Sequence, residues 1–124
     1  MNVVDSSGWL EYFADGPNAS RFVAPLREVD ELVVPAVSVY EVFKVLLRES
    51  GEDAALQGVA AMQRATVIDL TATLSMSAAT LSLKHSLPMA DSIILATAEA
   101  HEAMLWTQDS DFDGVPGVKY FRKQ

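Results

Sequence analysis

Four acidic residues occupy positions where a carboxylate contributes little to a folded structure. Each borders or interrupts an apolar stretch: Asp5, Glu41, Asp91 and Asp109, with Asp111 two positions beyond the last. A buried carboxylate is costly unless it is paired, hydrogen-bonded or bound to a metal. If the fold brings these side chains together, their mutual repulsion requires a cation. The residues therefore indicate a divalent-metal site, for which metal-assisted hydrolysis is the natural chemistry.

The composition restricts the metal that such a site could take. The chain has no cysteine and only two histidines, His85 and His101. Thiolate zinc sites and cysteine nucleophiles are thereby excluded, and two histidines are too few for a histidine-rich zinc centre. Ligation mainly by oxygen favours Mg²⁺ or Mn²⁺.

The net charge of −8, from 17 acidic and 9 basic residues, bears on the substrate. It argues against tight nonspecific binding of nucleic acid, which depends on neutralising phosphates, but it does not exclude a nuclease. Lys44, Arg48 and Lys84 are basic residues that could guide a strand. The first residues have no basic segment of the kind that opens a signal peptide, and no apolar run reaches membrane-spanning length. We therefore expect a cytoplasmic protein.

Short strand-like runs alternate with helix-length patterns over residues 1–124, a length that fits one domain. Strands are expected at 3–4, 32–35, 67–68, 104–106 and 118–121. Helices are expected from Ser6-Ser7 to 13, at 18–29, 36–49 and 52–65, from a Thr71 cap to 83, and at 90–102. The last helix is apolar nearly all round from Ile93 to Ala98, which predicts a buried element. This alternation predicts an α/β fold whose parallel sheet is covered on both faces.

The expected topology could gather the acids at one edge of the sheet. Asp5 and Asp109 follow strands, whereas Glu41 and Asp91 lie near helix starts, and in a parallel sheet these positions share an edge. Each acid also has a structural explanation: Asp5 and Asp91 as helix caps, Glu41 as a partner of Lys44, and Asp109 with Asp111 as turn residues. For Asp91 a functional role is the better explanation, because its helix is too apolar to lie on the surface. Asp69, another strand-end acid, is expected to be a cap or a surface residue.

With these acids in this order, the chain resembles the PIN-domain ribonucleases, and among them the VapC-type toxins. Residues 3–7 resemble the family's opening strand and first metal-binding aspartate, and residues 37–42 resemble the helix that carries its glutamate. The segment 87–98, with Pro-Met-Ala-Asp, is the most diagnostic part. Residues 107–112 match a Thr-x-Asp-x-Asp-Phe motif, and 115–118 continue in the family's manner. The four motifs occur in order over nearly the whole chain.

The resemblance implies a three-layer α/β/α sandwich around a mostly parallel sheet. It implies an Mg²⁺- or Mn²⁺-dependent endoribonuclease, in which metal-activated water leaves 5′-phosphate and 3′-hydroxyl ends. Asp5, Asp91 and Asp109 would bind metal, and Glu41 would bind it or orient the water. Asp111 would reach a second metal or support the loop, and Thr107 and Ser6 would donate hydrogen bonds that orient the carboxylates. The expected partners, again by resemblance, are RNA, a VapB-type antitoxin with a basic side chain among the acids, and a second copy in a homodimer.

Two other classes of protein fit parts of the pattern. A receiver-type signalling domain would have this length, charge and β/α order, with Asp69 as its phosphorylated residue, but it leaves Glu41 and Asp91 unexplained. A PIN-like module that binds a partner without cutting RNA would suit the acidic charge, although its acids are intact. The sequence does not identify the RNA that a nuclease would cut.

Overall fold

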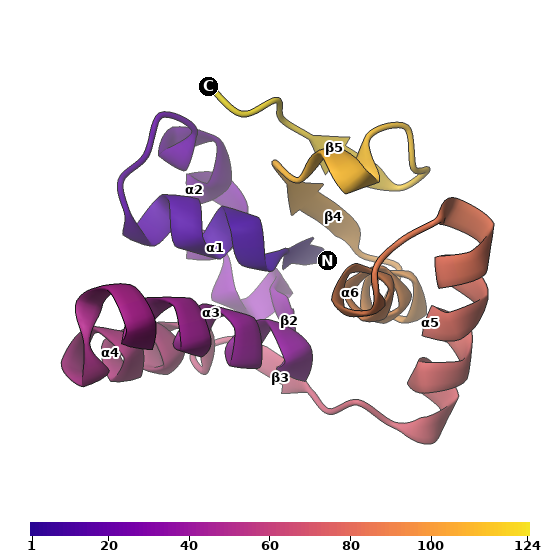
Figure 1. The fold of residues 1–124 in the computed structure, drawn as a ribbon, viewed down its shortest axis with the longest axis horizontal. Coiled ribbons are helices and arrows are strands. Elements are labelled where there is room, and N and C mark those ends of the chain that lie inside the picture. The colour runs from indigo at the N-terminus through magenta and orange to yellow at the C-terminus, as the bar shows by residue number, and fades with distance from the viewer.

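In the computed structural model, which describes residues 1–124, short strands alternate with helices along the chain (Figure 1). The strands are β1 (Asn2–Val4), β2 (Val33–Pro35), β3 (Thr66–Ile68), β4 (Met104–Thr107) and β5 (Val118–Tyr120). The helices are α1 (Ser6–Phe13), α2 (Ala19–Arg27), α3 (Ala36–Ser50), α4 (Glu52–Met62), α5 (Ala72–His85) and α6 (Met89–Ala100). Two single turns of 3-10 helix, η1 (Val29–Glu31) and η2 (Ser110–Phe112), complete the order.

The strands are all parallel, as the sequence predicted. β4 lies between β1 and β5, and β2 pairs with β3. A single parallel bridge from Asn2 to Leu32 joins the two groups, so the strand order is β3-β2-β1-β4-β5. Strand ends that are far apart in the sequence therefore meet at one carboxyl edge, where Thr107 pairs with Tyr120.

Alternation along the strands divides the core between two faces of the sheet. Val3, Val33 and Leu105 pack with α5 and α6, whereas Val4 and Val34 pack with α1 to α4. Figure 1 shows the strands between these two groups of helices. Because successive residues of a strand point to opposite faces, three-residue strands suffice to hold both layers. The predicted three-layer α/β/α sandwich is confirmed.

Helix α6 is the more deeply buried of the two helices in its layer. Every residue from Ser92 to Ala98 is buried, as its all-round apolar pattern predicted. Ala78 and Leu81 of α5 belong to the same core cluster as the apolar residues of α6. This burial places the first turn of α6, which carries Asp91, at the edge of the core.

The helix starts are only partly as predicted. Thr71 caps α5 as expected, with its side chain accepting a hydrogen bond from the third residue beyond it. For α1 the N-cap is Asp5, as its structural explanation expected, and not Ser6 or Ser7; Asp5 accepts from the backbone N–H of Gly8. A carboxylate beside the unpaired N–H groups of a first turn is a favourable cap.

Several helices end earlier than predicted. The segment expected to be helical over 18–29 ends at Arg27, where Glu28 leaves helical geometry and η1 follows. The helix expected over 52–65 ends at Met62, because residues 63–65 turn back toward β3. None of the helices combines the length and hydrophobicity that a membrane crossing requires.

Candidate active site

Asp5 is the most deeply buried carboxylate at the carboxyl edge, with only 2% of its surface exposed. One oxygen, Oδ1, accepts hydrogen bonds from Gly8 N (2.9 Å) and Ser7 Oγ (2.7 Å). The other, Oδ2, accepts from Thr107 Oγ1 at 2.6 Å. Burial raises the pKa of Asp5 from its ordinary 3.8 to about 6, although these hydrogen bonds act in the opposite direction. Asp5 thus caps a helix and is also held rigidly at the sheet edge.

Three further carboxylates, those of Asp91, Asp109 and Asp111, converge beside it. One oxygen from each lies within 4.8 Å of the others. Asp91 comes from the first turn of α6, and the other two come from the segment that follows β4. Asp109 Oδ1 accepts from the backbone N–H of Asp111 (2.9 Å), so Asp109 also caps η2. Its turn-shaping role and its place in the cluster are compatible.

The clustering perturbs the protonation of Asp91. Burial and then the negative charge of Asp109 raise the pKa of Asp91 from 3.8 to about 7. A side-chain hydrogen bond with Asp111 and the charge of Asp5 act in the same direction. A carboxyl group with a pKa near 7 is about half protonated at neutral pH. The buried cluster therefore disfavours a negative charge on all of its members.

Thr107 connects Asp5 to the cluster. This buried residue, the last of β4, donates to Asp5 and accepts from the backbone N–H of Asp109 at 2.9 Å. Its hydroxyl also lies 3.4 Å from Ser7 Oγ. The register of β1 beside β4, with Val4 opposite Trp106, brings Asp5 and Thr107 to the same level of the sheet.

Glu41 lies apart from this cluster and is held by Ser6. Ser6 Oγ donates to Glu41 Oε1 at 2.7 Å, across 35 residues of sequence. The alternative in which Glu41 pairs with Lys44 is wrong, because the Lys44 ammonium lies over the Tyr40 ring and 3.4 Å from its hydroxyl. Glu41 is not among the three carboxylates that lie within 4.8 Å of one another.

Sequence reasoning missed three polar residues at this edge. Ser7 contacts Asp5 directly and accepts from the backbone N–H of Gln108 at 3.2 Å. Asn18, fully buried, donates to Gln108 Oε1 at 3.0 Å across 90 residues of sequence. The adjacent serines after Asp5 were a usable signal for Ser7. Nothing local marked Asn18, whose partners are brought near only by the sheet.

A scan against family models matches the PIN domain over residues 3–118. The chain belongs to the PIN-domain family. This membership excludes the receiver-type alternative, and Asp69 is an exposed residue outside the acidic cluster. No curated protein matches this PIN domain by sequence.

Solved structures share its fold. A toxin–antitoxin complex from Klebsiella pneumoniae is 22% identical, with a TM-score of 0.79 over 96% of each chain. VapC20 of Mycobacterium tuberculosis, described as a toxin that cleaves the sarcin–ricin loop, is 18% identical with a TM-score of 0.76, covering 94% of this chain and 95% of its own. VapBC2 of Rickettsia felis, solved with a promoter DNA fragment, is 12% identical with a TM-score of 0.74, covering 99% and 98%. At these identities the likeness establishes the fold.

The acidic cluster of this PIN domain has the donor chemistry of a hard divalent cation. Its candidate ligands are carboxylate oxygens, and His101 Nδ1 is instead 2.9 Å from the backbone carbonyl of Thr97. Mg²⁺ and Mn²⁺ prefer such ligands. Burial is the first cause of the raised pKa of Asp91, and a cation would relieve the second, the repulsion by Asp109. The residues therefore fit the metal that the sequence led us to expect.

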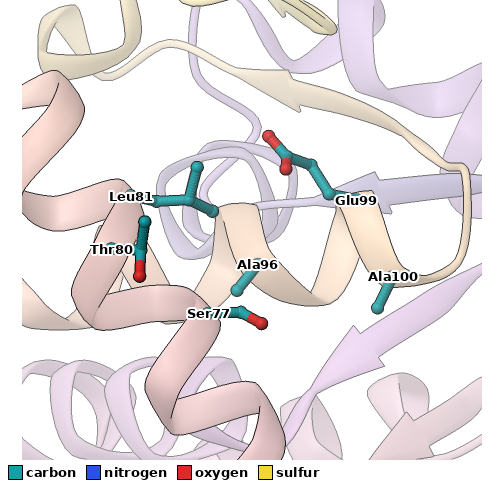
Figure 2. Close-up of a pocket in the computed structure, with 6 residues that line it drawn as sticks. All are labelled: Ser77, Thr80, Leu81, Ala96, Glu99 and Ala100. Atoms are coloured by element: carbon teal, nitrogen blue, oxygen red, sulfur yellow. The ribbon is translucent and has the colours of Figure 1, made fainter.

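The largest cavity of the PIN domain, about 420 Å³, lies elsewhere, between α5 and α6. Its lining consists of Ser77, Thr80, Leu81, Ala96, Glu99 and Ala100 (Figure 2). Glu99 is its only charged residue, and none of the site carboxylates borders it. A single carboxylate among small side chains offers no second catalytic group, so this cavity is not a rival active site.

Proposed function

We propose that this protein is a metal-dependent endoribonuclease and the toxin of a VapBC-type toxin–antitoxin pair. Membership of the PIN family and the names of its structural neighbours, a toxin–antitoxin complex and an RNA-cleaving toxin, support this assignment. The observation that carries it is the meeting of Asp91, Asp109 and Asp111 beside a buried Asp5. A silent binding module would have no need to maintain so unfavourable a cluster.

The proposed metal ligands are Asp5, Asp91 and Asp109, with Asp111 in reach of the same position. A Mg²⁺ or Mn²⁺ ion held there would supply positive charge to the phosphate oxygens and lower the pKa of a water. Thr107 fixes the orientation of Asp5 and of the Asp109 backbone, as groups behind metal ligands commonly do.

Glu41 is proposed to orient the attacking water. Ser6 occupies Oε1 of its carboxylate, which leaves Oε2 to accept a hydrogen bond from that water. With water as the nucleophile, the products carry 5′-phosphate and 3′-hydroxyl ends. A 2′,3′-cyclic phosphate would contradict this mechanism, because it requires attack by the ribose hydroxyl.

The proposed partners are a VapB-type antitoxin and a second copy of the chain. The neighbours include toxin–antitoxin complexes, two of them bound to DNA. A basic antitoxin side chain placed among the acids would neutralise them much as a cation does. The net charge of −8 suits such a partner. The homodimer follows from the family resemblance alone.

Expression of the wild-type chain and three variants tests the proposal. Asp5→Asn and Asp91→Asn remove site carboxylates, and Asp69→Asn is the matched control at an exposed strand-end acid. We expect wild type and Asp69→Asn to arrest growth and to leave discrete 5′-phosphate ends in cellular RNA, and the two site variants to do neither. Growth arrest that survives both site substitutions would show that these acids are not the active site. A folded wild-type chain that neither arrests growth nor cuts RNA would favour the binding module.

A further inference from the structure

Basic side chains gather at the carboxyl end of β5. Four of the nine basic residues, Arg21, Lys119, Arg122 and Lys123, lie on α2 and on the C-terminal strand and segment, and all four are exposed. Neither of the two ion pairs in the structure includes any of them. Arg48 alone among the nine basic side chains forms an ion pair, so what distinguishes these four cations is that they occupy one surface.

Aromatic rings hold two of these cations in place. The Arg21 guanidinium lies 5.2 Å from the centre of the Phe121 ring, and Lys119 Nζ lies 4.4 Å from that of Trp106. These two rings are themselves 6.1 Å apart. Cation–π contacts fix the position of a charge while leaving its outer donors free.

A shallow cavity of about 220 Å³ opens at this cluster. It is lined by Arg21, Tyr120, Phe121, Arg122 and Gln124. Two guanidinium-bearing residues thus border one hollow. Arginine binds phosphate through paired N–H groups, so the lining suits a phosphate of a nucleic-acid strand.

Hydrogen bonds connect this cavity to the strand end that carries the acids. The backbone N–H of Phe121 donates to the carbonyl of Thr107 at 2.9 Å. Asn18 Nδ2 lies 3.0 Å from both the carbonyl of Arg122 and Oε1 of Gln108, the neighbour of Asp109 in the chain. Figure 1 shows the C-terminal segment leaving β5 on the side of α2. These contacts connect the lining of the cavity to Thr107 and Gln108, which directly precede Asp109 in the chain.

We propose that this cavity, with Arg21 and Arg122, is a subsite for a backbone phosphate of single-stranded RNA next to the cleaved position. The inference rests on the proposed ribonuclease function. An acidic cluster repels a polyanion, so the strand needs positive charge beside it to stay bound. Proteins bind single-stranded nucleic acid on surfaces that combine cations with aromatic rings. The basic residues that the sequence suggested for guiding a strand lie elsewhere, Lys44 and Arg48 on α3 and Lys84 on α5.

The test compares two charge-matched double variants in an Asp91→Asn background, which prevents cleavage. Arg21→Gln/Arg122→Gln removes the subsite, and Arg48→Gln/Lys84→Gln removes the same charge from other exposed positions. Binding of a short fluorescein-labelled single-stranded RNA is measured by anisotropy over a range of NaCl. Each lost phosphate contact reduces the slope of log K against log[salt] by about 0.7 for a single strand. We expect a change of about 0.7 for the subsite pair, because one phosphate contact is lost, and none for the control pair.

Equal slopes in the two pairs would overturn the subsite, and would be the result if this face instead binds an acidic protein. Cleavage of the same RNA by the wild-type chain, measured in parallel, tests the proposed function separately. If RNA is cleaved but the slopes are equal, the subsite alone is wrong; if RNA is neither bound nor cleaved, both proposals fail. Arg21→Lys/Arg122→Lys should restore the slope by restoring charge. If Arg21→Gln loosens the Phe121 contact and unfolds the chain, Arg122→Gln alone should still reduce the slope, by up to about 0.7.

Discussion

The substitution Asp91→Asn should make the metal-free protein more stable while abolishing its response to metal. In the folded chain, burial and the charge of Asp109 raise the pKa of Asp91 to about 7. The ionised form is therefore disfavoured in the native state relative to the unfolded state. Asparagine has nearly the same shape, removes the charge, and keeps an N–H donor for the contact with Asp111.

The size of the effect follows from the pKa. A change from 3.8 to about 7 corresponds to about 4 kcal/mol, at roughly 1.4 kcal/mol for each tenfold change in proton affinity. Asp91 is only partly buried and solvent screens its charge, so we expect about 1–2 kcal/mol. For a chain of this length, that stabilisation raises Tm by about 3–8 °C.

The sign depends on pH. A carboxyl group whose pKa is raised on folding destabilises the native state above that pKa, and the penalty decreases as pH falls. The gain from Asp91→Asn should therefore be full at about pH 8 and should shrink toward about pH 5, where native Asp91 is protonated. The exposed control Asp69→Asn should change stability by less than about 0.5 kcal/mol at either pH.

Urea and thermal unfolding in EDTA, and again with Mg²⁺, provide the assay. Mg²⁺ should stabilise wild type and Asp69→Asn through mass action, and should not stabilise Asp91→Asn. If Asp91→Asn proves less stable than wild type at about pH 8 in EDTA, the carboxylate contributes a favourable structural contact and the repulsion argument fails. Equal Mg²⁺ stabilisation of all three proteins would refute Asp91 as a ligand.

Three other changes test neighbouring parts of the structure. Thr107→Val, which leaves Asp5 Oδ2 without its donor, should cost about 1–3 kcal/mol in urea unfolding and about 10–100-fold in metal affinity by titration calorimetry; unchanged affinity would contradict its orienting role. Gly8→Ala places a Cβ 2.5 Å from a buried β1 methyl carbon and should cost about 1–3 kcal/mol by thermal unfolding, whereas an unchanged Tm would mean that the core yields there. Ser6→Ala, which releases Glu41, should lower kcat with little change in Mg²⁺ affinity, and a parallel loss of metal binding would make Glu41 a ligand.

The sequence predicted the elements whose side-chain pattern is set locally. Parallel strands and an all-buried helix follow from Val3-Val4, from Val33-Val34 and from the run Ile93–Ala98, because burial on every side requires apolar side chains. Helix ends were less predictable, since α2 stops at Arg27 and α4 at Met62, before the predicted ends at 29 and 65. Strand order was not predictable: three ladders and one bridge from Asn2 to Leu32 set it, and no local pattern encodes those contacts.

The polar contacts at the site were beyond sequence reasoning for the same reason. Thr107 reaches Asp5 across 102 residues, and Ser6 reaches Glu41 across 35. Each pair depends on which strand or helix lies alongside another. The sequence was enough to identify the acids that would form a site if the fold brought them together. It could not say which hydroxyl would hold which carboxylate.

The structural and catalytic explanations of these acids do not compete. Asp5 caps α1 and Asp109 caps η2, as the structural reading proposed, yet both carboxylates face a cluster that a cap alone would never need. Asp5 and Asp109 differ from Asp69 because they are at least partly buried near other carboxylates. Asp69 is exposed to solvent, where a lone carboxylate carries no free-energy penalty. A strand-end aspartate in a parallel sheet is informative when its oxygens are buried and other carboxylates converge on it, whatever hydrogen bonds it also accepts from the backbone.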